Sequence, residues 1–352
     1  MMDLNHKKVL IIRADNIGDL VCTTPVFSAL KKTYPHMQLD VLVNSYNLAV
    51  LFQNPDIDHV YYYTKAKHRG KLSLFSIYWH RLKTLMKMRH TRYEYVILAG
   101  VDYQHKGVKH AKQIGNKNIV GYCRIDSPKR SLFAIPVDYY KRPDQHEVES
   151  VFDIIQPLGI SGKPGPLTVI PEPDEVAKVK AVLKQHHVVA SQPIIGIHIS
   201  SRKPRNRWPE SHFINLIQQL WDQYHYPLML FWSPGDEHNP LHPGDDQKAQ
   251  RIVEALPKVK LIPYRTTELP ELIAGMSLCQ SMVCCDGGAM HIAAALVKFM
   301  VALFGCTNVT HWHPWGLPQT SLTSATQHAK DISVKEVLSA YQKLAKQYEQ
   351  KS

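Results

Sequence analysis

Polar residues and glycines cluster directly after several apolar runs of this sequence, and such clusters could bind or transform a ligand. The run at residues 9–13 leads into RADNIGD, in which Gly18 permits a bend and Asp19 enters the first turn of a helix. Open α/β sheets bind ligands beyond the carboxyl ends of their strands, so Asp19 is placed where a substrate would lie. Its carboxylate could also serve only to balance the positive end of that helix.

A second cluster, DGGAMH at residues 286–291, follows the apolar run SMVCC. Gly287 and Gly288 leave the free N–H groups of the next helix uncovered, so a phosphate or diphosphate could approach the positive end of its dipole. Asp286 could accept hydrogen bonds from sugar hydroxyls while His291 donates to phosphate. A helix-capping aspartate and a buried histidine with only structural roles are the alternative.

A third cluster, SSRKPRNRWP at residues 200–209, places two hydroxyls and four cations before a helix. Ser200 and Ser201 beside Arg205 and Arg207 form a phosphate-binding mixture, because guanidinium groups match phosphate oxygens and stay charged when desolvated. A solvated basic loop is the alternative.

A fourth loop, SPGDE at residues 233–237, follows the next apolar run. Its carboxylates, Asp236 and Glu237, could hold a ribose by accepting hydrogen bonds from its hydroxyls.

These clusters need a sheet to position them, and apolar, β-branched runs alternate with helical patterns throughout the chain. The expected strands are 9–13, 39–43, 59–63, 95–100, 118–122, 194–199, 227–232, 259–263, 282–286 and 299–305. The expected helices are 19–34, 75–92, 210–223, 247–255, 268–276, 288–296 and an amphipathic helix over 333–350. This βαβ rhythm predicts two successive α/β units with parallel sheets.

The boundary between the units is expected at residues 159–173, where four prolines and three glycines fall together. We therefore assign a first domain to 1–160, a linker to 161–173 and a second domain to 174–330. The C-terminal helix, within 331–352, could pack back on the first domain.

Composition excludes several classes of protein. Hydrophobic residues make up 44% and charged residues 20%, which suits ordinary buried cores, and no run of 18 apolar residues could span a membrane. The six cysteines are scattered without a C-x-x-C pair, which argues against structural zinc and disulfides. In SMVCC we expect them to be small buried hydrophobes. These features lead us to expect a cytosolic protein.

Most of the net charge of +12 lies in residues 1–160, which hold 23 Lys and Arg against 14 Asp and Glu. Residues 64–93 alone carry nine Lys and Arg, three His and no acidic residue. This distribution predicts an anionic partner for the first domain, although a solvated basic face over an ordinary core is the alternative.

Three ordered motifs resemble glycosyltransferase family 9, the lipopolysaccharide heptosyltransferases. They are RADNIGDLVCTTPVFSALKKTYP at 13–35, SSRKPRNRWPESHF at 200–213, and DGGAMHIAAAL with ALFGCT at 286–307. The resemblance covers nearly the whole chain and includes HEVESVFDIIQPLGI at 146–160. It implies a GT-B fold, in which two Rossmann-like domains face a cleft, the first binding the acceptor and the second the nucleotide-sugar donor.

The resemblance also implies roles for single residues, with the family's catalytic carboxylate falling on Asp19. The implied donor-binding residues are Ser200, Ser201, Arg205, Arg207, Glu237 (or Asp236), Asp286, Gly287, Gly288 and His291. Asn206 stands where the family usually has Lys, and we expect a neighbouring arginine to supply the lost charge. Gly287 and Cys306 depart from the usual Thr or Ser and the usual Pro, which we expect to affect donor preference.

The implied reaction inverts the anomeric carbon and needs no cofactor and no metal ion. Asp19 would act as general base on an acceptor hydroxyl, which attacks from the face opposite the diphosphate. Arg205, Arg207, the Gly287–Gly288 helix start and His291 would stabilise the leaving group in place of a metal. Asp56-Ile57-Asp58 looks like a metal-binding D-x-D, but it precedes an expected strand of the acceptor domain.

The implied partners are ADP-heptose as donor and the anionic lipid A and inner core of lipopolysaccharide as acceptor. We expect acceptor contacts from Arg13, Lys83, Lys87 and Arg89. Aromatic and cationic residues alternate over 75–92, which suits docking on anionic lipid headgroups or a phosphorylated oligosaccharide. We therefore expect a cytoplasmic protein, peripheral on the inner face of the inner membrane of a Gram-negative-type bacterium.

Several alternatives stay open. The chain could transfer another sugar to a different surface glycan, or bind nucleotide sugars without turnover. The net charge and the pI of about 9.3 raise the possibility of nucleic-acid binding, but RNP, KH and helix-turn-helix signatures are absent from the sequence. A nicotinamide-dependent oxidoreductase would need the G-x-G-x-x-G fingerprint, which the first expected strand lacks.

Overall fold

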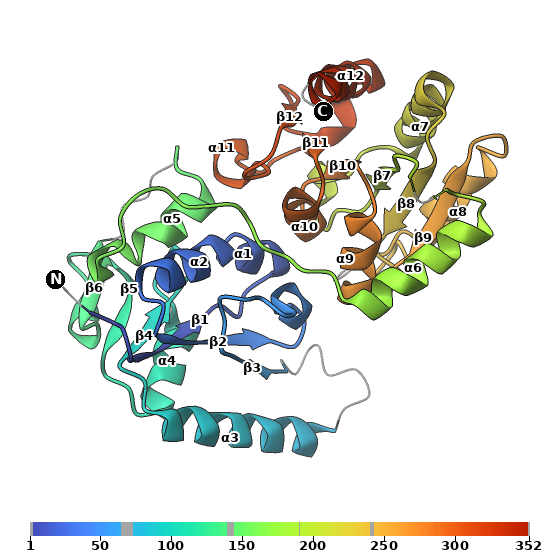
Figure 1. The fold of residues 1–352 in the computed structure, drawn as a ribbon. Coiled ribbons are helices and arrows are strands. Elements are labelled where there is room, and N and C mark those ends of the chain that lie inside the picture. Colours follow the sequence, from blue (N-terminus) through green and yellow to red (C-terminus); the bar gives the residue numbers. More distant parts are fainter. Residues whose placement is uncertain (1–2, 65–72, 139–143, 190, 240–242, 351–352) are drawn as a thin grey trace. The chain divides into compact units, whose positions relative to one another are not determined.

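The structure, a computed structural model, describes residues 3–64, 73–138, 144–189, 191–239 and 243–350. It divides into two compact units, residues 1–168 and 169–352, each built on a six-stranded sheet (Figure 1). Each sheet is covered by helices and its strand pairs are parallel, so the expected α/β class with two parallel sheets is confirmed. No helix within the described ranges is long and apolar enough to cross a membrane.

The sheet of the first unit has the strand order β3-β2-β1-β4-β5-β6. Its strands are β1 (Lys8–Ile12), β2 (Gln38–Asn44), β3 (His59–Tyr63), β4 (Tyr95–Leu98), β5 (Ile119–Cys123) and β6 (Ile135–Asp138). The chain runs outward from β1 to β3 on one side and returns to β4 on the other side of β1. The loops after β1 and β4 therefore diverge at a topological switch point, where open α/β sheets bind ligands.

Helices cover both faces of this sheet, with α1, α2 and α5 on one face and α3 and α4 on the other (Figure 1). They are α1 (Ile17–Val21), α2 (Thr24–Thr33), α3 (Leu74–Thr91), α4 (His105–Gln113) and α5 (Glu147–Asp153). The single helix expected over 19–34 is broken at Cys22 and Thr23. Pro25, in the first turn of α2, has no N–H to continue the hydrogen-bond ladder of α1.

The sheet of the second unit repeats this topology with the order β12-β11-β10-β7-β8-β9. Its strands are β7 (Ile195–His198), β8 (Leu228–Trp232), β9 (Leu261–Arg265), β10 (Ser281–Cys285), β11 (Phe299–Phe304) and β12 (Gln319–Thr323). The switch point lies between β7 and β10, so the loops that follow these two strands flank the expected ligand crevice of this unit.

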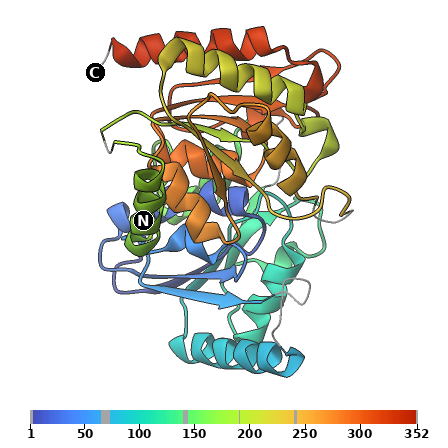
Figure 2. The same ribbon diagram turned by 90° about the vertical axis from the view of Figure 1, so that its right-hand side faces the viewer.

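Seven helices are assigned in the described part of the second unit. They are α6 (Pro173–Gln185), α7 (Glu210–Tyr224), α8 (Asp246–Glu254), α9 (Leu269–Ser277), α10 (Gly288–Leu296), α11 (Val309–Trp312) and α12 (Val334–Glu349). Helix α12 packs beside α7 and over β11 (Figure 2), and its Val337 and Tyr341 are buried in the core of this unit. These contacts place α12 in the second unit, and the packing on the first domain that the sequence left open stays a prediction.

The sequence analysis missed two strands and several helices. Both strands, β6 and β12, lie at sheet edges and are only half-buried, so they lack the continuous apolar run that marked the others. β6 also contains Pro136, which a central strand would exclude. Helices α4 and α6 are rich in Lys and Gln, and few of their buried positions carry a large apolar side chain, so the apolar period is weak in the sequence.

Five of the six cysteines are buried and all six are free, as expected of small apolar residues. Burial raises the pKa of the Cys22, Cys279 and Cys284 thiols. Cys306, in the loop after β11, is exposed.

Candidate functional site

The carboxylate of Asp19 lies beyond the carboxyl end of β1, at the switch point of the first sheet. Asn16 is the N-cap of α1, and Asp19 is the third residue of that helix. Asp19 Oδ2 accepts hydrogen bonds from the backbone N–H of Asn16 at 2.9 Å and from its side-chain amide at 2.8 Å. The side chain is 15% exposed, so the carboxylate is held in one orientation and still reachable by a ligand.

The buried guanidinium of Arg13 connects Asp19 to the rest of the first unit. Its Nη2 donates to Asp19 Oδ1 at 3.3 Å and to Glu147 Oε1 at 2.5 Å, while Nη1 donates to the carbonyl of Ala99. Burial alone would lower the pKa of Arg13, but the charges of Glu147, Asp19 and Asp15 outweigh it and raise that pKa. Arg13 therefore remains a cation at every physiological pH.

These contacts give Arg13 a different environment from the acceptor contact that the sequence led us to expect. Its side chain is 3% exposed, and its hydrogen bonds are made to protein groups. Sequence reasoning missed its partner Glu147, the buried first residue of α5. An acidic residue at a helix start is usually read as balancing the helix dipole, and no local pattern marks the one that pairs with an arginine 134 residues away.

The loops after β7, β8 and β10 are joined by the two expected serines. Ser200 Oγ accepts a hydrogen bond from the backbone N–H of Ser233 at 2.8 Å, and Ser201 Oγ donates to the carbonyl of Asp286 at 2.8 Å. Ser200, Ser201 and Asp286 are thus brought together at the switch point of the second sheet. Because Ser200 Oγ accepts here, its own proton can be donated to a ligand.

Asn206 lies at the centre of this loop cluster and is 1% exposed. Its Nδ2 donates to Asp286 Oδ2 at 2.6 Å and to Thr307 Oγ1 at 3.0 Å, and its Oδ1 accepts from the N–H groups of Gly305 and Cys306, each at 3.1 Å. The position where the family usually has Lys is therefore occupied by a bridging amide. No charge is needed at this position to hold the loops together.

Gly305 is required by the same close approach. A Cβ atom at this residue would lie 2.0 Å from the carbonyl oxygen of Arg205 and 2.7 Å from Asn206 Oδ1. The side chain of Arg205 itself belongs to an exposed residue of the short turn over 204–206.

The start of α10 is open, as the two glycines led us to expect. Gly287 is the N-cap residue, with φ 159° and ψ −178°, and a Cβ atom there would meet no heavy atom within 4 Å. Asp286, just before it, is 8% exposed, and His291 inside the helix is 3% exposed with its ring 5.7 Å from that of Trp312. The space beside Gly287 is therefore open, and the N-cap makes no side-chain hydrogen bond to the helix start, which suits an anion.

A hollow of about 460 Å³ lies beside the loop after β7. Its lining is Arg207, Trp208, Pro209, Glu210, Glu237, His238, Asp245, Lys248 and Arg251. Arg207 pairs with the buried carboxylate of Asp245. Glu237, the expected ribose ligand, lies 3.5 Å from Arg251. The hollow therefore presents both a guanidinium and a carboxylate.

Lys248 is a buried cation that the sequence did not reveal. Its Nζ donates to the carbonyls of Ile199 and Trp208 at 3.2 Å and 2.9 Å and lies 4.7 Å from the centre of the Phe213 ring. Burial lowers the pKa of Lys248. In the sequence of α8, nothing distinguishes this lysine from the surface lysines of other helices. Only the folded structure shows that its Nζ holds the backbone at the end of β7.

The loop over 233–237 is held by Asp246. Its carboxylate accepts from Arg265 Nε at 3.0 Å, from Trp232 Nε1 at 2.7 Å and from the N–H of Gly235 at 3.0 Å. The hydrogen bonds from Arg265, followed by those from Trp232 and Gly235, lower the pKa of Asp246 to about 2. The loop that carries Asp236 and Glu237 is therefore fixed by a permanently ionised carboxylate.

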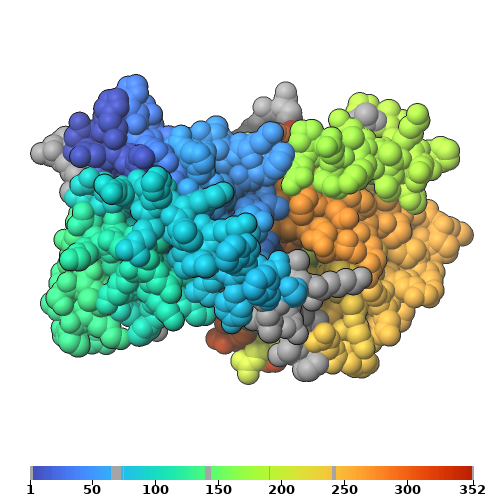
Figure 3. Space-filling model, turned by 90° about the horizontal axis from the view of Figure 1, so that it is seen from below, coloured from blue at the N-terminus to red at the C-terminus, as the bar shows by residue number. Residues whose placement is uncertain are grey.

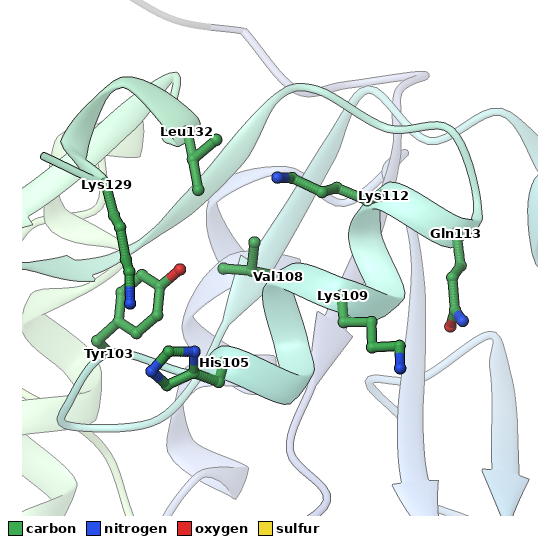
Figure 4. Close-up of a pocket in the computed structure, with 8 residues that line it drawn as sticks. All are labelled: Tyr103, His105, Val108, Lys109, Lys112, Gln113, Lys129 and Leu132. Carbon is green, nitrogen blue, oxygen red and sulfur yellow. The ribbon is translucent and has the colours of Figure 1, made fainter.

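A second hollow, of about 520 Å³, lies on the first unit between α4 and the turn over 129–132 (Figure 4). Its lining is Tyr103, His105, Val108, Lys109, Lys112, Gln113, Lys129 and Leu132. Lys129 Nζ lies 4.7 Å from the centre of the Tyr103 ring. Three lysines and no acidic residue line the hollow, so it suits an anion. Sequence reasoning missed it, since its lysines are spread over residues 109–129.

The other expected residues lie away from these hollows. Lys83, Lys87 and Arg89 are exposed on α3, while Lys65, Lys67, Arg69 and Lys71 lie outside the described residues. Asp56 accepts a hydrogen bond from Ser28 at 2.5 Å, and Asp58 pairs with Lys31 at 2.7 Å, so both carboxylates of the D-x-D triplet serve the fold. Within the described ranges, no group of three or more His, Cys, Asp or Glu could hold a metal ion.

Comparisons with known proteins give a consistent result. The model of glycosyltransferase family 9 (heptosyltransferase) matches residues 85–342. Lipopolysaccharide heptosyltransferase 3 of Escherichia coli is 26% identical, covering 85% of this chain and 83% of the relative.

Solved structures show the same fold. A family 9 glycosyltransferase from Veillonella parvula superposes with a TM-score of 0.82 at 19% identity, covering 98% of this chain and 99% of that one. The ADP-heptose LPS heptosyltransferase II of E. coli gives a TM-score of 0.74 at 22% identity, covering 97% and 99%. The expected family and the two-sheet GT-B architecture are thereby confirmed.

The bridging role of Asn206 yields a stability prediction. Asn206→Ala should lower the free energy of unfolding by about 1–3 kcal/mol, because the N–H groups of Gly305 and Cys306 would remain buried without their acceptor. Urea unfolding followed by circular dichroism measures the change. Arg205→Ala, an exposed neighbour in the same turn, is the matched control. Equal midpoints for the two variants would contradict the bridge.

Proposed function

This chain belongs to glycosyltransferase family 9, the heptosyltransferases, and we propose that it moves a heptose from ADP-heptose to the core of lipopolysaccharide with inversion at the anomeric carbon. The names of its relatives supply the donor and the acceptor class. The observation that carries the proposal is the carboxylate of Asp19, oriented by Asn16 and Arg13 at the switch point of the acceptor unit.

In this proposal Asp19 acts as general base. One of its oxygens takes the proton of an acceptor hydroxyl as that hydroxyl oxygen bonds to the anomeric carbon. The bond from this carbon to the diphosphate breaks on the opposite face, and the electron pair leaves with ADP. Arg13 cannot compete for the proton because it is already a cation held by Glu147. We therefore assign Arg13 as a positioning residue.

We assign the departing ADP to the second unit, where positive groups follow β7 and β10, and we propose that these groups take the place of a metal ion. The open start of α10 at Gly287 and Gly288 supplies N–H groups, and His291 lies within the same helix. Arg205 and Arg207 supply guanidinium groups from the loop after β7. Their charge offsets the negative charge that develops on the leaving diphosphate.

The polar groups around these cations complete the proposed donor site. Ser200 donates its hydroxyl proton to phosphate, while Ser201 holds the carbonyl of Asp286 in place. Glu237 and Asp286 accept from the hydroxyls of ribose or of the transferred sugar.

The anionic acceptor is assigned to the basic surfaces of the first unit. The hollow lined by Lys109, Lys112 and Lys129 has the charge for a phosphate or carboxylate, and the ring of Tyr103 offers a flat face for a sugar. Lys83, Lys87 and Arg89 are exposed on α3, which covers the same face of the sheet as α4 (Figure 1), and we propose that they attract the same anionic acceptor. We propose that the protein meets this bilayer-anchored acceptor in the cytoplasm, on the inner face of the inner membrane of a Gram-negative-type bacterium.

Removal of the base gives the first functional prediction. Asp19→Asn should lower kcat for heptose transfer by about 10²–10⁴-fold, because the amide cannot take the hydroxyl proton. Binding of ADP-heptose, measured by calorimetry, should persist. Asp15→Asn, whose carboxylate lies 3.7 Å from the same arginine, is the matched control and should retain turnover. Full activity in Asp19→Asn would refute the assignment.

The proposed donor site gives the second functional prediction. Arg207→Ala and Arg205→Ala should each weaken ADP binding about tenfold, since each removes a charge-assisted contact of about 1.4 kcal/mol. Calorimetry with ADP measures the dissociation constant. Lys335→Ala, an exposed cation on α12, is the control. Unchanged affinity in both arginine variants would move the diphosphate elsewhere.

The lysine-lined hollow beside α4 gives the third functional prediction. The triple variant Lys109→Ala, Lys112→Ala, Lys129→Ala should raise the KM for acceptor about tenfold and leave the KM for ADP-heptose unchanged, because only the acceptor needs these charges. Lys117→Ala, an exposed cation just beyond α4, should change neither constant. An equal rise in both KM values would argue against an acceptor site here.

A further inference from the structure

Helix α3 exposes an apolar stripe to solvent. Five of the eight large apolar side chains exposed in the described part of the chain belong to it, namely Phe75 (78% exposed), Tyr78 (64%), Trp79 (51%), Leu82 (48%) and Met86 (63%). They are spaced three and four residues apart, so they share one face of the helix. The helix lies on the face of the first unit that Figure 3 shows. An apolar patch of this size on a soluble protein indicates an interaction site.

The stripe is not needed to attach α3 to its sheet. The opposite face of the helix is buried through Ile77, Thr84 and Met88, and Met88 belongs to the core cluster of the sheet. The helix therefore has two apolar faces. One packs against the sheet, and the other is exposed to solvent. Phe75 and Trp79 stack on each other with ring centres 6.4 Å apart, which orders the first turns of the open face.

Cations flank the open stripe. Lys83, Lys87 and Arg89 are exposed along the same helix, and Lys83 Nζ lies 5.4 Å from the centre of the Trp79 ring. Acidic residues are absent from the sequence between Asp58 and Glu94. An apolar stripe bordered by lysine and arginine is typical of a helix that lies in the interface of an anionic membrane, where the long cationic side chains reach the headgroups.

We propose that α3 is the membrane-contacting element of this protein, lying parallel to an anionic bilayer with the side chains of Phe75, Tyr78, Trp79, Leu82 and Met86 at the boundary of headgroups and acyl chains. This extends the proposed function, whose acceptor is anchored in a bilayer, by naming the surface that meets the lipid. Charge decides between occupants. A second copy docked through the same face would set Lys83, Lys87 and Arg89 near their own counterparts, whereas anionic lipids neutralise them.

Vesicle binding tests the proposal with the full chain. In co-sedimentation, the protein should bind phosphatidylcholine vesicles that contain about 30% phosphatidylglycerol at least tenfold more tightly than vesicles of phosphatidylcholine alone. The variant Phe75→Ser, Trp79→Ser, Met86→Ser should lose at least tenfold in affinity for the anionic vesicles. Lys83→Gln, Lys87→Gln, Arg89→Gln should also bind less tightly, with a weaker dependence on salt.

Matched controls separate membrane contact from misfolding. Ile125→Ser and Val189→Ser remove other exposed apolar side chains and should leave vesicle binding unchanged. The melting temperature of the triple serine variant should match that of the wild type, because the three side chains are open to solvent. Trp79→Phe should keep vesicle binding and lose the part of the blue shift in tryptophan emission that Trp79 contributes.

Three results would overturn the proposal. These are wild-type protein that ignores anionic vesicles, a triple serine variant that binds them as the wild type does, and a dimer in sedimentation velocity that the same variant dissolves. The assay contains no ADP-heptose, so vesicle binding without heptose transfer would refute only the proposed function. Transfer to a delipidated acceptor by a protein that ignores vesicles would refute only the membrane contact.

Discussion

The first unit depends on one buried cation. Arg13 leaves the central strand at the point where strand order reverses, and it ties together the loop after β4, the start of α5 and the carboxylate of Asp19. Burying a guanidinium is costly unless its charge is matched, and here Glu147 matches it. Glu147 already balances the charge of the arginine. The longer contact of Asp19 with the same guanidinium therefore orients its carboxylate and leaves it able to accept a proton. The geometry of Asp19, which we propose as the general base, thus follows from the way this buried charge is matched.

In the second unit, the side chain that joins the loops at the end of the sheet is neutral. Asn206 joins the loops after β7, β10 and β11 through one amide, which donates to Asp286 and Thr307 and accepts from Gly305 and Cys306. An amide carries both donors and acceptors, whereas a lysine only donates. One neutral side chain thereby fixes the geometry of three loops. The proposed diphosphate site is left with the flanking arginines and the start of α10.

Much of this arrangement could be predicted from residues alone, because strand-end clusters such as DGGAMH join local turn chemistry to a fixed position in a parallel sheet. The buried strands were also predicted, because each of them is an apolar run in the sequence. Edge strand β6, the partner role of Glu147 and the burial of Lys248 could not be predicted, since each depends on contacts between segments far apart in the chain. The lysine hollow beside α4 could not be predicted either, because its lining residues come from separate segments of the chain. The aromatic and cationic residues of α3 could be read from the sequence, but their division between a buried face and an exposed face could not, because apolar residues on both faces produce no simple amphipathic period.

The exposure of a single cysteine has a practical consequence. Five thiols are packed inside the two sheets and their flanking helices, and burial keeps several of them protonated, so they resist alkylating reagents. Cys306 is open to solvent, and its backbone N–H is bonded to Asn206. A maleimide dye or a nitroxide would therefore attach at one place in the native protein. That place is the loop after β11, beside the proposed donor site, where a probe can follow ligand binding without any engineered residue.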